Sequence, residues 1–285
     1  MVTSGDGLEN GHRYSSREGG GVSRSNRLYI GDVVYLEETA STNQVLVDRA
    51  RAGATDGLVV VADRQSAGRG RHQRNWVSPP VGSLLCSVLF RPEQLPVDQL
   101  YNLTSIVALA ARRSCIAFGG ADVSVKWPND LITPAGKLAG VLAELVISTP
   151  PSVVVGIGCN LFWPAGWPPT DDTSGIAELI KDATTLEESC GRQVARDEFL
   201  ESFLDEVDSL YAALLGPDGP ATIGLEYESA CSTIGQRVQV DTPTGRLVGV
   251  AARVNDDGSL EVEVDGHTER ISAADVVHLR PAESE

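Results

Sequence analysis

The sequence is short of positive charge. Its 285 residues include 23 lysines and arginines against 39 aspartates and glutamates, a formal net charge of −16. Nucleic acids and anionic membranes are bound through basic faces, so the composition predicts neither DNA nor a membrane as a partner. No apolar run is long enough to span a bilayer, and the N-terminus lacks the apolar core of a secretory signal. We therefore expect a cytoplasmic protein.

Cysteine is scarce as well, with five residues that lie far apart in the chain. No Cys-x-x-Cys pair occurs, which argues against a zinc site or a thioredoxin-like motif, and reduced thiols of a cytosol fit best. Two phosphate-binding fingerprints are also missing. There is no Gly-x-x-x-x-Gly-Lys-Ser/Thr segment, and Gln73 stands where a dinucleotide fingerprint needs its third glycine.

The composition divides the chain into three parts. Residues 1–27 are rich in Gly, Ser, Asn and Arg, which predicts a disordered leader that cannot form a helix-turn-helix domain. Residues 28–228 carry the long apolar segments and are expected to form the main domain, and residues 229–285 are expected to form a small second domain. Hydrophobic residues make up 42% of the chain, which suffices for a sizeable core.

Strand-like and helical segments alternate through the middle part. Strands are expected at 28–38, 57–63, 83–90, 123–127, 137–147 and 153–161, and helices after Ser41, at 99–118 and at 195–216. Ser41 and Gln44 have the spacing of a capping box, and Asp98 is the expected N-cap of the second helix. The segment 216–224, GPDGPATIG, is expected to be a linker or at least a break between helices.

The last part of the chain changes character. Short apolar or alternating pieces are separated by the turn signals TPTG, NDDG and DGH, which mark hairpins. The pieces lie at 237–240, 246–254, 260–264 and 276–279. They predict a small antiparallel barrel of about 50 residues.

One segment runs against the negative balance. GRGRHQRNW, residues 68–76, concentrates Arg69, Arg71 and Arg74 between glycines and ends at Trp76. Glycines let the backbone come close to a ligand, and arginine offers fixed donors to carboxylate or phosphate oxygens. The alternative is a solvated turn whose arginines pair with surface carboxylates. On this segment alone both interpretations stay open.

Two further stretches favour a binding site. In GIGCNL, residues 156–161, two glycines allow close approach of the backbone and Asn160 adds an amide. In KWPNDLITPAGKLAGVLAEL, residues 126–145, polar side chains surround a Trp-Pro pair at a strand end, and a lysine opens the next, nearly uncharged strand. These polar residues are Lys126, Asn129, Asp130 and Lys137.

Taken in order, the segments ETASTN, DRQSAGRGRHQRNW, KWPNDL, GKLAGVLAEL and GIGCNL resemble the motifs of biotin–protein ligases. The resemblance covers roughly residues 38–161. It implies an α+β fold: a mixed β-sheet flanked by helices, as in class II aminoacyl-tRNA synthetases, followed by an SH3-like barrel. It also implies an enzyme that activates biotin with ATP and magnesium and transfers it to a lysine of a biotin carboxyl carrier domain. The leader predicts the form that lacks the family's N-terminal DNA-binding domain.

Carried over position by position, the resemblance assigns a site. It implies that biotin is contacted by Ser41, Thr42, Asn43, Gln65, Gly68, Arg69, Gly70, Arg71 and Lys137. It implies that ATP or the adenylate is contacted by Arg74, Trp76, Asn129 and Asn160. Lys137, Arg71 and Arg69 are the expected catalytic residues, and Asp130 is the expected metal ligand. A capping box at Ser41 would compete for its hydroxyl.

Two rival functions stay open. One is a lipoate–protein ligase or octanoyltransferase, and the other is a non-catalytic sensor that binds biotin on a degenerate ligase fold. A pocket lined by Ser41, Thr42 and Gln65 suits the polar ureido head of biotin better than a bare acyl chain, and an intact Lys137 argues against the sensor. The resemblance further implies a monomer or a weak homodimer.

Overall fold

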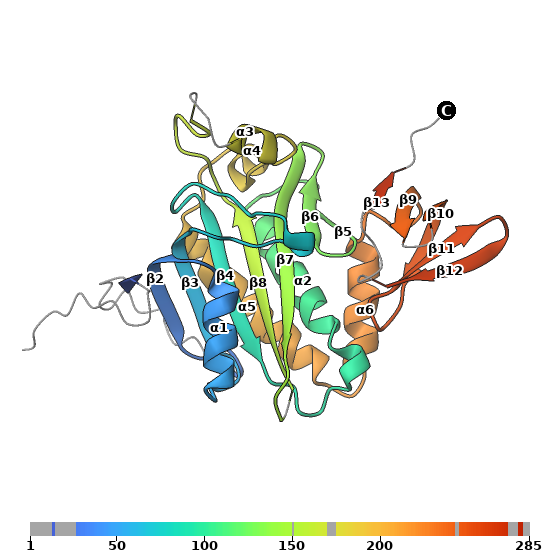
Figure 1. Cartoon of the computed structure of the whole chain (residues 1–285), viewed down its shortest axis with the longest axis horizontal. Coiled ribbons are helices and arrows are strands. Elements are labelled where there is room, and N and C mark those ends of the chain that lie inside the picture. The colour runs from blue at the N-terminus through green and yellow to red at the C-terminus, as the bar shows by residue number, and fades with distance from the viewer. Residues whose placement is uncertain are drawn as a thin grey trace, which may run out of the picture.

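The chain folds around two β-sheets, which Figure 1 shows side by side. This computed structural model describes residues 27–149, 151–169, 175–242, 245–272 and 279–281, and the backbone of Arg13 and Tyr14. The larger sheet has the strand order β1-β2-β3-β4-β8-β7-β6-β5. Its strands are β1 (Arg13–Tyr14), β2 (Val33–Thr39), β3 (Val59–Gln65), β4 (Ser83–Phe90), β5 (Ser124–Lys126), β6 (Asp130–Thr133), β7 (Gly136–Val146) and β8 (Ser152–Asn160).

The larger sheet is mixed. Strands β2 and β3 run parallel and are joined by helix α1 (Thr42–Arg51), whereas every other neighbouring pair is antiparallel. A parallel pair needs a crossover connection, and α1 provides it. The mixed sheet with flanking helices that we expected is therefore confirmed.

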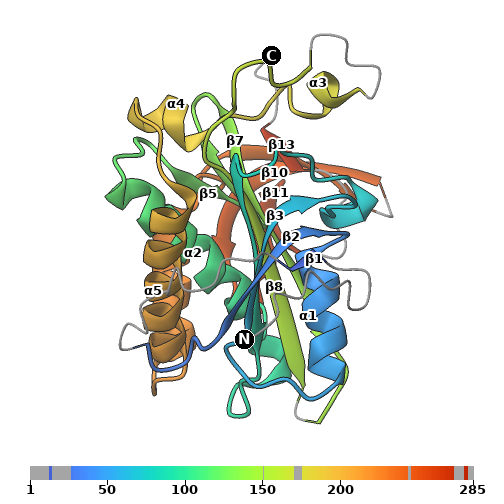
Figure 2. The ribbon, with the colours of Figure 1, turned by 90° about the vertical axis from the view of Figure 1, so that its left-hand side faces the viewer.

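Helices cover both faces of this sheet (Figure 2). Helix α1 packs on one face, and α2 (Asn102–Ala117) and α5 (Arg196–Leu214) lie on the other, with α6 (Gly219–Ala230) beside α2. Successive side chains of a strand point to opposite faces, so Val60 joins the cluster under α1 while Val59 and Val61 join the cluster under α2. All of β4 is buried, as a strand covered on both sides must be.

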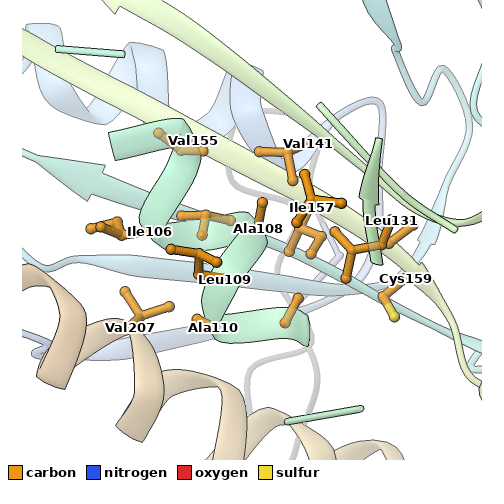
Figure 3. Packing of buried hydrophobic residues seen from close by; sticks show 14 of the residues in the cluster. Ile106, Ala108, Leu109, Ala110, Leu131, Val141, Val155, Ile157, Cys159 and Val207 are labelled. Carbon is orange, nitrogen blue, oxygen red and sulfur yellow. The ribbon is translucent and has the colours of Figure 1, made fainter. Parts of the chain in front are cut away.

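The main apolar core lies between the sheet and α2. Figure 3 shows Ala108 of α2 on the side of Ile157 of β8 and Val141 of β7, and Leu109 of α2 on the side of Val207 of α5. Burial of such side chains supplies the main driving force for folding. This core extends to residues of the second sheet, so the two sheets share one continuous apolar cluster.

The second sheet, which we call the C-terminal sheet, is antiparallel throughout, with the order β12-β11-β10-β9-β13. Its strands are β9 (Arg237–Thr242), β10 (Gly245–Val254), β11 (Leu260–Val264), β12 (His267–Ile271) and β13 (Leu279–Pro281). Asp265 and Gly266 form a two-residue hairpin loop with φ of 47° and 85°, the turn that an Asp-Gly pair favours. Residues 276–278 of the last expected strand lie outside the described residues.

One expectation about a helix boundary is wrong, and another is narrowed to one of its two alternatives. Asp98 is not the N-cap of α2, because it lies in a short 3₁₀ helix (η2, Val97–Gln99) and Tyr101 precedes the α-helix. Of the two alternatives for 216–224, a linker or a break between helices, the structure shows the break, because α5 ends at Leu214 and α6 already begins at Gly219. Proline is tolerated in the first turn of a helix, where Pro220 lies.

Several short elements were not expected from the sequence. They include the strands β1, β6 and β12 and the helices α3 (Ile176–Leu179) and α4 (Leu186–Cys190). A signal for α4 was present, since Thr185 and Glu188 form a reciprocal capping box at its start. No helix within the described part of the chain is long and apolar enough to cross a membrane. All five cysteines are free thiols.

The N-terminal end of the catalytic region is tied to α5. Asp208 of α5 accepts hydrogen bonds from the backbone N–H groups of Leu28, Tyr29 and Ile30 at 2.7 to 2.9 Å. Arg27 forms an ion pair with Asp205 at 2.7 Å. Apart from Arg27 and the short β1, the leader expected at 1–27 lies outside the described residues, and the division between domains at residue 228 stays a prediction.

We expect Asp208→Ala to lower the free energy of unfolding by about 1–3 kcal/mol, because three backbone donors lose a charged acceptor. Asp205→Ala is the matched control on the same helix. It removes only a half-exposed ion-pair partner and should cost less than about 1 kcal/mol. Chemical denaturation of both variants measures the difference, and equal losses would show that Asp208 does not anchor the segment.

Candidate functional site

A cavity of about 570 Å³ opens where α1 begins, between β3, β7 and β8. This volume is typical of sites for small organic ligands. The cavity collects almost all of the predicted site residues, which come from distant parts of the chain. Lining it are Ser41, Thr42, Asn43, Gln65, Arg69, Gly70, Arg71, Arg74, Trp76, Asn129, Asp130, Lys137 and Asn160. Gly68 does not line the cavity.

Ser41 precedes α1 in an extended conformation and makes no capping hydrogen bond, so the expected capping box is wrong. Its hydroxyl is therefore not used by the helix. The next residue belongs to a polar network: Gln65 Oε1 accepts from the backbone N–H of Thr42 at 2.7 Å and from its hydroxyl at 3.0 Å. These bonds use the carbonyl end of the Gln65 amide and leave its Nε2 as the donor end.

Ser87 of β4 also belongs to this polar network, and we did not identify Ser87 from the sequence as part of the site. Its hydroxyl lies 2.7 Å from both Thr42 Oγ1 and Asn43 Oδ1. A polar residue inside the apolar strand β4 was the available signal, since buried polar groups are normally hydrogen-bonded. Ser87 thus supports the predicted ligand contact at Thr42 without lining the cavity.

The side-chain amide of Asn43 makes hydrogen bonds to three other residues of the protein. Besides the bond to Ser87, its amide nitrogen donates to the Leu142 carbonyl at 3.1 Å and to Glu144 at 3.0 Å. A Cβ atom on Gly156 of β8 would overlap Asn43 Oδ1. Asn43 therefore fixes the start of α1 against β7, and Gly156 is the residue that makes room for it.

Residues 68–76, here called the arginine segment, form a closed loop. Trp76 N–H donates to the Gly68 carbonyl at 2.9 Å, and Gly70 N–H donates to the Arg74 carbonyl at 2.7 Å. His72 adopts a left-handed conformation with φ 53° at the tip. The glycines and the left-handed residue allow the chain to reverse over the mouth of the cavity.

The Trp76 indole lies on the glycines of the sheet. A Cβ atom on Gly158 would overlap the indole, and one on Gly140 would lie 3.3 Å from it. Trp76 Nε1 is buried and has no hydrogen-bond partner among the described groups. A buried donor without a partner costs free energy, which indicates that a ligand or water satisfies it.

Lys137 lies beside this indole at the start of β7. Its Nζ is 5.8 Å from the Trp76 ring centroid and 2.7 Å from Asp130 Oδ1. Its backbone N–H donates to the Asp182 carbonyl at 2.7 Å, and its carbonyl accepts from Thr184 N–H at 2.9 Å. The segment after α3 is thereby held along β7, and it brings two apolar side chains to the cavity, Leu179 and Ile180.

Arg69 and Arg71 are placed differently, although the sequence suggested one role for both. Arg69 pairs with Glu144 at 3.1 Å and its side chain is 43% exposed. Arg71 lines the cavity, and burial lowers the pKa of its guanidinium, while Tyr101 and Asp130 act in the opposite direction. Arg71 is thus the more deeply placed cation of the arginine segment.

The lining as a whole is cationic in a protein that is strongly acidic. The charged side chains of the described lining are Arg69, Arg71, Arg74, Lys126 and Lys137 against Asp130 and Asp182. Five cations and two carboxylates leave a positive balance inside a chain of net charge −16. Such a cavity attracts anionic ligands.

The two asparagines that we expected near the nucleotide also make hydrogen bonds within the protein. Asn129 Nδ2 donates to the Val141 carbonyl at 2.6 Å. Asn160 Nδ2 donates to the Thr184 carbonyl at 3.1 Å, and its Oδ1 accepts from Ser83 at 3.2 Å. Both residues line the cavity and fix the strand ends around it.

Asp130 was expected to help to hold a metal. Among the described residues no group of three or more His, Cys, Asp or Glu side chains could hold a metal ion. Mg²⁺ in nucleotide sites is usually bound through one or two carboxylates together with phosphate oxygens. Asp130 lies in the cavity and could supply the one carboxylate ligand of a Mg²⁺ ion that is bound together with a polyphosphate. The metal-binding role of Asp130 stays a prediction.

Comparisons with known proteins define the class. The Biotin/lipoate A/B protein ligase family matches residues 35–160, and the Biotin protein ligase C terminal domain matches residues 233–279. The chain is 36% identical over 250 residues to the biotin--[acetyl-CoA-carboxylase] ligase of Mycobacterium tuberculosis, covering 86% of this chain and 88% of that protein. It is 30% identical to the enzyme of that name from Paracoccus denitrificans, covering 85% and 98%.

A solved structure agrees. The biotin protein ligase from Aquifex aeolicus in complex with biotin and ATP superposes with a TM-score of 0.74 at 26% identity, covering 89% of this chain and all of that one. The protein described here belongs to the biotin protein ligase family.

The packing of Trp76 on the sheet yields a stability test. We expect Gly158→Ala to cost about 1–3 kcal/mol, because the new methyl group overlaps the indole. In a Trp76→Ala background the same change should cost less than about 0.5 kcal/mol. A double-mutant cycle by chemical denaturation measures the coupling, and additive costs would contradict the packing.

Proposed function

We propose that this protein is an ATP-dependent biotin–protein ligase. It activates biotin as biotinyl-5′-AMP with release of pyrophosphate and then transfers biotin to a lysine of a biotin carboxyl carrier domain. The observation that carries the proposal is the cavity, in which a polar corner around Thr42 and Gln65 adjoins the cations Arg71 and Lys137. Family membership and the names of the relatives support it.

The first step requires two anions to meet. A carboxylate oxygen of biotin forms a bond to the α-phosphorus of ATP, and the bond from that phosphorus to the bridging oxygen breaks as pyrophosphate leaves. Two unit charges about 4 Å apart repel by about 4 kcal/mol at an effective dielectric constant near 20. Arg71 and Lys137 offset this repulsion and stabilise the charge that spreads in the transition state.

The polar corner is suited to the ureido head of biotin. Thr42 and Gln65 present a hydroxyl and an amide in a fixed orientation, because Ser87 holds the first and Thr42 holds the second. Pre-oriented polar groups discriminate strongly between ligands that can and cannot pair with them. A bare acyl chain would offer no acceptor to the Gln65 Nε2 donor, which disfavours lipoate or octanoate.

The arginine segment closes the site over the adenylate. The mixed anhydride is reactive toward water, and a loop that covers it retains it until the acceptor arrives. The acceptor lysine attacks the acyl carbon of the anhydride as a neutral amine, and AMP leaves. Arg71 on the segment and Lys137 on the opposite wall hold the phosphate during this transfer.

A metal ion would be held by the phosphates and Asp130. When bound, it would neutralise further phosphate charge. The acceptor that we propose is the carrier domain of a biotin-dependent carboxylase, in line with the names of the relatives. A monomer or weak homodimer, without DNA binding, remains our expectation.

Ligand-dependent exchange of radioactive pyrophosphate into ATP tests the proposal. Biotin and lipoate are supplied side by side to the full-length protein. Exchange with biotin and not with lipoate supports a biotin ligase. Exchange driven by lipoate would favour the lipoate ligase, and binding of biotin without any exchange would favour the sensor.

We expect Lys137→Ala to slow adenylate formation by roughly a hundredfold or more, because one of the two cations proposed to offset the repulsion between the reacting anions is lost. Lys181→Ala is the control, since Lys181 pairs with Glu178 outside the cavity. Single-turnover formation of biotinyl-5′-AMP measures both rates. A normal rate in the Lys137 variant would remove this residue from the mechanism.

We expect Arg71→Gly to release biotinyl-5′-AMP into solution and to label lysines of unrelated proteins. The reason is that the closed segment loses the guanidinium that holds the phosphate. Arg51→Gly, at the exposed end of α1, is the matched control. Labelling of serum albumin in a mixture with the carrier domain provides the readout, and the lid role would be refuted by equal labelling with both variants.

A further inference from the structure

The C-terminal sheet touches the catalytic region at the turn that follows β5. Trp127, whose side chain is almost fully buried, donates from Nε1 to the Gly258 carbonyl at 2.9 Å. Gly258 lies in the turn between β10 and β11, residues 255–259. Asn102 at the start of α2 donates to the Asp256 carbonyl of the same turn at 3.3 Å. The β10–β11 turn is therefore seated against the segment that borders the cavity.

Tyr101 stands between the β10–β11 turn and the cavity. A Cβ atom on Gly258 would overlap its ring, so the glycine makes the contact possible. On the other side the Tyr101 hydroxyl donates to the Pro128 carbonyl at 2.8 Å, and the Tyr227 hydroxyl lies 3.1 Å from the same oxygen. Burial raises the pKa of Tyr101, so the phenol keeps its proton and remains a donor at neutral pH.

The Pro128 carbonyl, which accepts from Tyr101, lies one residue before Asn129, on the side of the cavity where we expect the nucleotide. Pro128 is followed by Asn129, which is bonded to β7 at Val141, and by Asp130, which pairs with Lys137. A shift of Pro128 would therefore move the partner of Lys137. Tyr101 itself does not line the cavity.

The β10–β11 turn is fixed by hydrogen bonds and an ion pair, so it can support Tyr101. Asp257 accepts from the Ser259 hydroxyl at 2.6 Å and forms an ion pair with Arg270 of β12 at 2.7 Å. Gly258 N–H donates to the Asn255 carbonyl at 2.8 Å. Two of these bonds close the turn on itself, and the ion pair ties it to β12 of the C-terminal sheet.

We propose that Tyr101 is a positioning residue, through which the β10–β11 turn of the C-terminal sheet holds Pro128, Asp130 and Lys137 in register for ATP. The inference rests on the proposed function and gives the C-terminal sheet a defined part in it. Loss of this support displaces the nucleotide side of the site and leaves the polar corner at Thr42 in place.

The test compares two glycines of the C-terminal sheet that share a left-handed conformation. Gly258 has φ 80° and Gly266 has φ 85°, but a Cβ atom on Gly266 would meet nothing within 4 Å. We expect Gly258→Ala to raise the KM for ATP in the exchange assay by roughly tenfold or more, because misplacement by a fraction of an ångström is costly. The dissociation constant for biotin, measured by calorimetry, should change by a smaller factor than the KM for ATP, because Thr42 and Gln65 stay in place. Gly266→Ala should leave both values within about twofold.

Tyr101→Phe keeps the ring and removes only the hydroxyl, and it covers the case in which Gly258→Ala does not fold. We expect it to raise the KM for ATP by roughly threefold to tenfold, with little effect on the thermal unfolding midpoint and a smaller effect on biotin affinity. A merely structural role would lower the unfolding midpoint and the amount of active protein without a selective change in the KM for ATP.

The outcomes separate the two proposals. If wild-type protein shows no biotin-dependent exchange, the proposed function fails. If wild-type protein is active and Tyr101→Phe has an unchanged KM for ATP, the positioning role of Tyr101 is refuted while the function stands. Equal changes in Gly258→Ala and Gly266→Ala would refute the part played by the β10–β11 turn.

Discussion

The proposed function imposes one electrostatic constraint on the structure: a carboxylate and a polyphosphate would have to touch inside a protein that is itself strongly anionic. A protein with a net charge of −16 repels such ligands over most of its surface. It can bind both only where cations are gathered and partly removed from water, since screening by solvent weakens a charge at the surface. The cavity meets this need, because Arg71 and Lys137 face one space from two separate segments.

The fold brings these segments together by sheet topology. Strand β8 is the centre on which α1, the arginine segment and β7 converge, and its glycines make room for them. Gly156 admits Asn43 and Gly158 admits the indole of Trp76. The same sheet is covered by α1 on one side and by α2 and α5 on the other, so the floor of the cavity is part of a packed sheet, whereas the arginine segment is a loop.

Much of this organisation could be predicted from sequence, because local patterns encode it. The buried run at Ser83–Phe90 and the Asp265-Gly266 hairpin have signals within a few residues of themselves. Non-local features had no such signal. The capping box at Ser41 was wrong although its spacing was correct, and the split between Arg69 and Arg71 depends on where Glu144 of β7 lies. The contact of Tyr101 with Gly258 joins residues more than 150 positions apart, and neither is unusual in its own segment.

The most direct measurement of the central claim is a crystal structure with biotin and a non-hydrolysable ATP analogue bound together. The account predicts that the biotin carboxylate and the α-phosphate lie within about 4 Å of each other, with Lys137 Nζ and the Arg71 guanidinium in contact with one or both. The ureido head should lie at Thr42 and Gln65. Ligands bound away from the arginine segment, or anions that contact neither cation, would contradict the account.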